Sequence, residues 1–213
     1  MVGETCNLGA YQCPDCQASD RARLYALYLE TWFRDIEQGV KKTFVDFAPS
    51  SSLTQCILGK IRDNGADIHY VTADLMKKGV DIKADIADMP VFADRSVDYF
   101  ICSHVLEHVP NDQRALGELF RILKPGGEGI LMVPIDLKAE KIDEDPTVTD
   151  VGERWRRFGQ DDHVRIYSKN GFLERVRAAG FIVTEYGASH FGRFVFWRHG
   201  ISQNSILYVV QRP

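Results

Sequence analysis

The chain has 213 residues, of which 45% are hydrophobic and 26% are charged, and it carries a net charge of −4. This length fits one domain with a substantial core and room for a small appendage. The composition is that of a globular protein rather than a disordered or fibrous one. The acidic balance counts against a nucleic-acid partner, because neutralising phosphates requires clustered Lys and Arg. We therefore expect a small-molecule partner.

No stretch approaches the roughly 20 apolar residues that cross a bilayer, and the N-terminus lacks the pattern of a signal peptide. We expect a cytoplasmic protein with no membrane partner, and the sequence leaves its oligomeric state open. Five cysteines without an export signal indicate reduced thiols. Cys13 and Cys16 form half of a closed zinc site, with Cys6 as a third candidate ligand and no evident fourth. A reduced turn is favoured over zinc there.

Residues 1–40 are predicted to be a cysteine-containing segment followed by a helix. Apolar residues recur at helical spacing in LYALYLETWF, and Ser19 or Asp20 can cap the helix start. From Thr43 onward, short apolar runs alternate with helical stretches. This alternation predicts a doubly wound, mainly parallel sheet over residues 41–213.

Later segments refine this α/β prediction. We expect a helix from about Asp112 to Lys124, ended by KPGG, and then a central strand, GILMVP. Residues 136–163 are long, charged and without clear periodicity, which favours a cap over the substrate. After a helix that follows Ser168, the runs FIVTEY and SILYVVQ predict an antiparallel hairpin at one sheet edge.

In open α/β sheets, ligands bind beyond the carboxyl ends of the strands, near the point where strand order reverses. The first strand leads into Asp46-Phe47-Ala48-Pro49-Ser50-Ser51-Ser52, which lacks the glycines usual in nucleotide-binding loops. Its small residues still permit close approach of a ligand, and its serines can cap the next helix. An ordinary strand-to-helix turn is the alternative.

The next strand ends supply polar side chains. Asp74 can accept hydrogen bonds from ribose hydroxyls, and Asp85 can accept one from an adenine amine, although each could instead cap its own turn. The segment SHVLEHVP then brings Ser103, His104, Glu107 and His108 to the cleft edge. Two histidines and a glutamate are costly there if they are only structural.

From Asp85 to Pro134 the sequence DIADMPVFADRSVDYFICSHVLEHVPNDQRALGELFRILKPGGEGILMVP resembles the methyltransferase type 11 family of class I S-adenosylmethionine-dependent enzymes. The residues CPDC, Arg21-Ala22-Arg23, FAPS, EDP and FGQDDHVRIY resemble a bacterial subgroup of that family. The resemblance therefore spans most of the chain. It departs from the wider pattern in the glycine-free first loop.

The resemblance implies a seven-stranded Rossmann-like sheet with an antiparallel final strand. It also implies S-adenosylmethionine as methyl donor, with S-adenosylhomocysteine as product. The cofactor contacts expected from it and from the strand ends are Asp46, Phe47, Ala48, Pro49, Asp74, Leu75, Asp85, Ile86, Ser103 and His104.

Methyl transfer is an in-line displacement, so the protein mainly aligns the nucleophile and removes its proton where needed. The candidate bases are His163, with Asp162 orienting the ring, and His108; a structural hydrogen bond is the alternative for each. Arg165 and Tyr167 are candidate substrate-binding residues or, alternatively, part of a surface face. No metal ligands are assigned in the cleft.

We therefore predict a methyltransferase acting on a small molecule, with a hydroxyl oxygen favoured because a histidine base is available. Nitrogen and sulfur acceptors remain open. An RNA-directed methyltransferase or a non-catalytic module that binds an adenosyl ligand is the alternative. An NAD-dependent oxidoreductase is least favoured, because FAPSSSL offers no glycine-rich cradle for a pyrophosphate.

Overall fold

A seven-stranded sheet forms the centre of the computed structural model, which describes residues 3–4, 6–37 and 39–213. The strands follow the order β3-β2-β1-β4-β5-β9-β8, and only β9 runs antiparallel to its neighbours. This arrangement confirms the predicted α/β fold. The strands are β1 (Lys42–Phe47), β2 (Ile68–Asp74), β3 (Ile82–Lys83), β4 (Val97–Ser103), β5 (Leu123–Met132), β8 (Ile182–Tyr186) and β9 (Leu207–Gln211).

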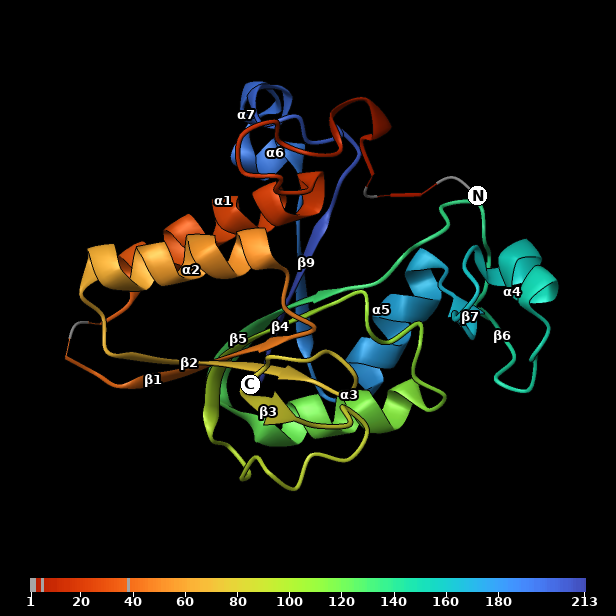
Figure 1. Cartoon of the computed structure of the whole chain (residues 1–213), viewed down its shortest axis with the longest axis horizontal. Helices are drawn as coiled ribbons and strands as arrows, with labels where there is room; N and C mark the ends of the chain where they lie inside the picture. The colour runs from red at the N-terminus through yellow and green to blue at the C-terminus, as the bar shows by residue number, and fades with distance from the viewer. Residues whose placement is uncertain (1–2, 5, 38) are drawn as a thin grey trace.

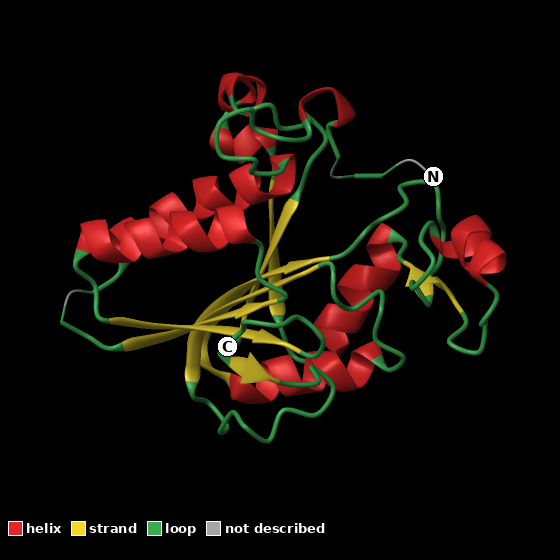
Figure 2. Ribbon diagram, viewed as in Figure 1, coloured by secondary structure: helices red, strands yellow, loops and turns green. Residues whose placement is uncertain are grey.

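Helices cover both faces of this sheet (Figures 1 and 2). Helices α1 (Asp20–Asp35) and α2 (Ser51–Asn64) lie side by side on one face, and α3 (Asp112–Ile122) and α5 (Lys169–Ala178) lie on the other. The chain runs from β1 to β2 and β3 in one direction and then returns to β4 and β5 in the other. The order of strands therefore reverses between β1 and β4, where ligands bind in such sheets.

Strand β4 shows why the sheet needs both helical layers. Tyr99 and Phe100 are both fully buried, yet neighbouring side chains on a strand point to opposite faces. Tyr99 contacts Trp32 of α1, with 4.6 Å between ring centroids, whereas Phe100 contacts Phe181 on the other side, at 6.4 Å. A strand buried on both faces is typical of a central parallel strand.

The helix starts agree with the sequence analysis, and one helix end does not. Ser19 caps α1 through its side chain, which accepts from the amide of Ala22, and Ser168 caps α5 through the amide of Gly171. Helix α3 ends at Ile122, before KPGG, and β5 begins at the next residue. KPGG is therefore part of a strand rather than a helix stop, because its backbone pairs into the sheet.

The predicted C-terminal hairpin is wrong in its connection. Strands β8 and β9 do pair antiparallel, but residues 187–206 separate them and contain α6 (Ala188–Phe191) and α7 (Arg193–Arg198). The pair does lie at one edge of the sheet as predicted, with β8 outermost and β9 between β5 and β8. The sequence analysis missed the two helices because both are very short.

The region predicted as a cap lies apart from the main sheet, at one end of the molecule (Figure 1). It contains α4 (Val151–Phe158) and β6 (Asp143–Glu144), and β6 pairs antiparallel with β7 (Arg165–Ile166), which follows this region. Near the N-terminus, a single 3₁₀ turn, η1, spans Leu8–Ala10. None of the helices in the described ranges is both long and apolar enough to cross a membrane.

Candidate functional site

Two adjoining cavities lie at the carboxyl ends of β1 and β4, where the strand order reverses. The outer cavity has a volume of about 510 Å³ and the inner one about 140 Å³. Phe47, Ala48 and His104 line both of them. The two cavities therefore form one continuous cleft, and its floor is made by the ends of β1 and β4.

The outer cavity is bordered by Asp74 and Asp85, which follow β2 and β3. The Asp74 Oδ1 atom accepts hydrogen bonds from the amides of Met76 and Lys77, both at 2.6 Å. The Asp85 Oδ1 atom accepts one from the amide of Ala87 at 2.9 Å. Each carboxylate thus caps its own turn and also lines the cavity, and its contact with a ligand stays a prediction.

The apolar part of the outer cavity fits the faces of a planar ring. Leu75 and Ile86 line it together with Val105. Leu75 is half-exposed, so its side chain has room to adjust to a ligand. Ile86 is buried, so its side chain is held in place by its neighbours. Carboxylates on the rim and aliphatic side chains on the walls match the ribose and the base of an adenosine.

Ala48 replaces the missing glycine in the loop after β1. Its φ of +53° lies in the left-handed region, which glycine adopts most easily, and its amide donates to the carbonyl of Ala73 at 2.9 Å. The loop can turn sharply without a glycine because alanine carries the smallest side chain. Pro49, by contrast, lines neither cavity among the described residues; its carbonyl accepts a hydrogen bond from Lys77.

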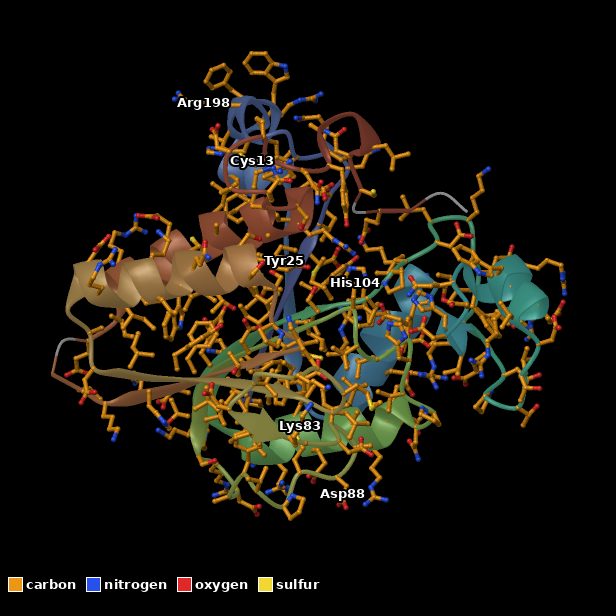
Figure 3. All side chains as sticks on the ribbon, viewed as in Figure 1. Cys13, Tyr25, Lys83, Asp88, His104 and Arg198 are labelled. Carbon is orange, nitrogen blue, oxygen red and sulfur yellow. The ribbon has the colours of Figure 1, made fainter. Side chains whose placement is uncertain are left out.

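Helix α1 closes the inner cavity, which the sequence analysis did not predict. Arg21 and Tyr25 lie one helical turn apart and both line it. The Tyr25 hydroxyl lies 2.7 Å from Oγ of Ser103, and Arg21 Nη1 lies 2.6 Å from Nε2 of His104. Figure 3 shows Tyr25 reaching from α1 towards the strand ends near His104. Two sequence features could have pointed to them: the Arg21-Ala22-Arg23 motif of the resemblance and the one-turn spacing of Arg21 and Tyr25.

Asp46 lies at the inner end of the cleft and is 1% exposed. Burial raises the pKa of its carboxyl group to about 7, against the lowering effects of the Tyr70 hydroxyl, which donates at 2.7 Å, and of Lys77. A cation in the inner cavity would favour the charged form of this carboxyl group.

His104 joins Arg21 to Glu107. A guanidinium can only donate, so the His104 Nε2 atom accepts from Arg21 and its Nδ1 atom carries the proton. That Nδ1 atom lies 3.1 Å from Oε1 of the buried Glu107 and donates to it. His104 itself has a φ of +57°, so the backbone turns sharply at the end of β4.

The three predicted catalytic residues lie close together, but their pairing differs from the prediction. Asp162 contacts His108, with 3.1 Å between its Oδ2 atom and Nδ1 of the ring, and not His163 as expected. His108 and Asp162 line the outer cavity. His163 is 7% exposed and lies behind them, with its ring 4.7 Å from that of His108 between centroids. The cap loop turns there so that the imidazole of His163 points inward.

Arg165 and Tyr167 are each only 1% exposed and already have hydrogen-bond partners. The Arg165 guanidinium donates to the carbonyls of Leu106 and Pro110 at 2.6 and 2.9 Å. The Tyr167 hydroxyl donates to Asp112 at 2.6 Å. Their burial argues against direct substrate contact. Arg165 fastens β7 to the loop after β4, and Tyr167 fastens the end of that segment to the start of α3.

The cysteines do not assemble a closed metal site within the described part of the chain. No cluster of three potential ligands includes Cys6, Cys13 or Cys16. Hydrogen bonds from the Cys16 and Asp15 backbone lower the pKa of the Cys13 thiol. The turn with reduced thiols stays a prediction.

Part of this chain is similar in sequence to known proteins. Residues 43–131 match the family of methyltransferase domains (Methyltransf_11). Over 82 residues the chain is 35% identical to sterol 24-C-methyltransferase erg6 of Schizosaccharomyces pombe, which covers 36% of this chain and 21% of that protein. The chain therefore spans about a fifth of the length of that relative.

Solved structures share the fold at low identity. One belongs to the complex between the Haloferax volcanii Trm112 methyltransferase activator and the putative methyltransferase; it has a TM-score of 0.57 and 18% identity, and covers 91% of this chain and 93% of that one. Another is Haemonchus contortus phosphoethanolamine N-methyltransferase 2 in complex with S-adenosyl-L-methionine, with a TM-score of 0.52, 12% identity, and coverage of 89% and 52%.

The fold and the matched segment point to the same class. Residues 43–131 match the methyltransferase domain family, whose cofactor is S-adenosylmethionine, and the sheet has the Rossmann-like arrangement of such domains. The cleft beside the turn at Ala48 has a polar rim and apolar walls.

Proposed function

We propose that this protein transfers the methyl group of S-adenosylmethionine to a hydroxyl oxygen of a small molecule. The observation that carries the proposal is the continuous cleft at the strand-order reversal. All of the predicted cofactor residues except Pro49 line it. S-adenosylmethionine supplies an electrophilic methyl group. The chain must therefore mainly bind the cofactor and the acceptor, orient them for the transfer and exclude water from the site.

In this proposal the outer cavity holds the adenosine. The Oδ1 atoms of Asp74 and Asp85 are occupied by backbone amides, which fixes both carboxylates and presents their second oxygens to the cleft. Asp74 accepts from the ribose hydroxyls and Asp85 from the adenine amine. Leu75 and Ile86 pack against the ring faces.

The inner cavity holds the amino-acid end of the cofactor. Arg21 pairs with its carboxylate, since a guanidinium matches the planar geometry of that group. Asp46 is buried, and its carboxyl group, with a pKa of about 7, is partly protonated near neutral pH in the free protein. It accepts a hydrogen bond from the ammonium group of the cofactor. The small volume, about 140 Å³, suits this end better than a nucleoside.

The acceptor enters from the side of His108 and Asp162, which line the outer cavity beneath the cap. A hydroxyl acceptor is favoured because imidazole nitrogen atoms lie at this edge and can accept its proton or hold its oxygen. Of the two predicted bases, His108 lies on the cavity surface and His163 lies deeper. The base role stays a prediction for both.

Calorimetric titration with S-adenosylmethionine, S-adenosylhomocysteine and NAD tests the cofactor assignment. We expect both adenosyl ligands to bind and NAD to give no heat. Asp74→Asn retains an oxygen that can cap the Met76 and Lys77 amides but loses the charge, so it should weaken adenosyl binding about tenfold, which is about 1.4 kcal/mol. Asp63→Asn, on the exposed end of α2, is the matched control.

Failure of both adenosyl ligands to bind the wild-type chain would overturn the proposal. Acceptor chemistry is tested separately, by following S-adenosylhomocysteine release with pools of hydroxylated, amine and thiol compounds. Turnover with amines or thiols alone would exclude the hydroxyl assignment and keep the cofactor assignment.

A further inference from the structure

The loop after β4 and the end of the cap bring three potential metal ligands together. Glu107 and His108 come from the loop and His163 from the cap, and one ligand atom of each lies within 4.8 Å of the others. The two segments are tied by a hydrogen bond from the Val164 amide to the Glu107 carbonyl, at 2.9 Å. The cluster is therefore built by the tertiary fold rather than by a local motif.

Glu107 supplies a buried carboxylate oxygen that lacks a partner. The residue is fully buried, and its Oε1 atom receives the hydrogen bond from His104. Within the described residues, its Oε2 atom has no hydrogen-bond partner. A buried carboxylate oxygen of this kind is costly without a hydrogen-bond donor or a cation.

Both histidines are oriented as metal-binding histidines usually are. The Nδ1 atom of His163 lies 3.1 Å from the Phe158 carbonyl, and a carbonyl can only accept. The Nδ1 atom of His108 lies 3.1 Å from a carboxylate oxygen of Asp162. Protonated Nδ1 atoms leave Nε2 of each ring with a lone pair, and such backbone and carboxylate partners are characteristic of metal-ligating histidines.

We propose that Nε2 of His108, Nε2 of His163 and Oε2 of Glu107 bind one divalent transition-metal ion at the edge of the cleft, where the ion takes an oxygen of the methyl acceptor. Two imidazoles and one carboxylate are the protein ligands of open catalytic zinc sites and of related iron sites. Mg²⁺ is a poorer match because it prefers oxygen ligands.

The site has one open side and one adjustable ligand. Ligand atoms about 2.0–2.2 Å from a zinc ion lie roughly 3.5 Å apart in a tetrahedral site, so binding must draw the three side chains closer together. His108 can supply this movement, because it is about one-third exposed and follows a short turn. Of the three ligands, His108 lines the outer cavity, so the ion would lie at the wall of that cavity.

A bound ion changes the role proposed for the histidines. A hydroxyl group that coordinates a divalent cation loses its proton to water more readily, so neither His108 nor His163 needs to act as a base. Only this acceptor role depends on the proposed methyl transfer. Binding of the ion itself can be measured without any turnover, which keeps the two proposals separable.

Titration with Co²⁺ and Zn²⁺ after removal of metal by a chelator tests the site. The protein carries Cys13→Ser and Cys16→Ser, so that thiolates do not contribute. We expect uptake of one equivalent, with Co²⁺ absorbing in the visible range and lacking a thiolate charge-transfer band. In this background, Glu107→Gln and His163→Gln should each weaken binding at least tenfold. His69→Gln, an exposed histidine of β2, is the matched control and should bind normally.

Circular dichroism and S-adenosylmethionine binding establish that each variant is folded, and His108→Gln replaces any variant that is not. No uptake of either ion by the Cys13→Ser, Cys16→Ser protein overturns the site, as does uptake that none of the three ligand substitutions changes. Ion uptake together with a failure to bind S-adenosylmethionine would instead overturn the proposed function and leave the metal site standing.

Discussion

The two sides of the cleft are built in different ways. On the side of β2 and β3, the half-buried Asp74 and the exposed Asp85 accept hydrogen bonds from amides two or three residues further along. On the side of β4, Arg21, His104 and Glu107 form a chain of contacts between segments far apart in sequence. The first side is local and can adapt to a ligand, whereas the second is fixed by tertiary structure and buried charge. Substitutions on the second side should therefore affect stability and binding together.

The largest expected effect is at Arg165, which anchors the cap to the β4 side. Arg165→Ala removes the buried guanidinium that donates to the carbonyls of Leu106 and Pro110, and it leaves Glu144 with Arg175 alone. Loss of one partner in a buried charged network typically costs about 3–5 kcal/mol. Urea denaturation followed by circular dichroism measures this loss in the free energy of unfolding. Arg156→Ala removes an exposed ion pair with Glu153 and should change the free energy of unfolding little. Equal stability of the two variants would contradict the anchoring role.

A second large effect concerns pH and Asp46. Its pKa, raised by burial to about 7, lies above the ordinary value of 3.8, so the folded state holds a proton that the unfolded state releases. Stability should therefore fall as pH rises from about 4 to 7 and level off above 7, by an amount on the order of 2–4 kcal/mol. Asp46→Asn should flatten this part of the curve measured by urea denaturation.

Tyr70→Phe sharpens the same test. It removes the hydroxyl that donates to Asp46, so the pKa of Asp46 should rise further and the sloping region should extend to higher pH. A wild-type stability that increases between pH 4 and 7, or an Asp46→Asn curve with an unchanged slope, would show that Asp46 is charged in the folded protein.

The residues on the β2 and β3 side of the cleft could be predicted from the sequence, whereas the contacts on the β4 side could not. Asp74 and Asp85 follow apolar strands directly, and strand ends meet at one edge of a parallel sheet, so their place was predictable. Arg21 comes from a helix before the first strand, and nothing in its neighbours shows that it contacts His104. The same limit explains the wrong pairing of Asp162, since which histidine it contacts depends on how the cap loop folds back on β4.

The fold was predictable for a related reason. Alternating apolar runs and helices specify a doubly wound sheet, and the Ser19 and Ser168 caps could be identified from single residues. The link between β8 and β9 could not, because α6 and α7 have only four and six residues and leave little periodicity. Strand order within the sheet depends on long-range pairing, which a local pattern does not contain.

A smaller effect is expected for Arg21, which tests the β4 side directly. Arg21→Ala should weaken S-adenosylmethionine binding about 10- to 100-fold, since a charged hydrogen bond is worth about 1.5–3 kcal/mol. Adenosine alone, which lacks the amino-acid end, should bind the variant and the wild type equally in calorimetry. Arg34→Ala, at the exposed far end of α1, is the control. Equal losses for both ligands would mean that Arg21 acts by shaping the cleft rather than by pairing with a carboxylate.

The smallest effect is expected at Ala48, where the two sides meet. An L-residue in the left-handed region costs about 1–2 kcal/mol, and glycine avoids this cost but loses about 0.5–1 kcal/mol through its greater freedom in the unfolded chain. Ala48→Gly should therefore stabilise the protein by less than about 1 kcal/mol in urea denaturation. Ala48→Val should destabilise it, because a branched side chain is strongly disfavoured at a φ of +53° and would also narrow both cavities. If valine is tolerated at no cost in stability or in cofactor affinity, the loop does not hold this conformation in solution. The turn at Ala48 would then not be the element that shapes the cleft.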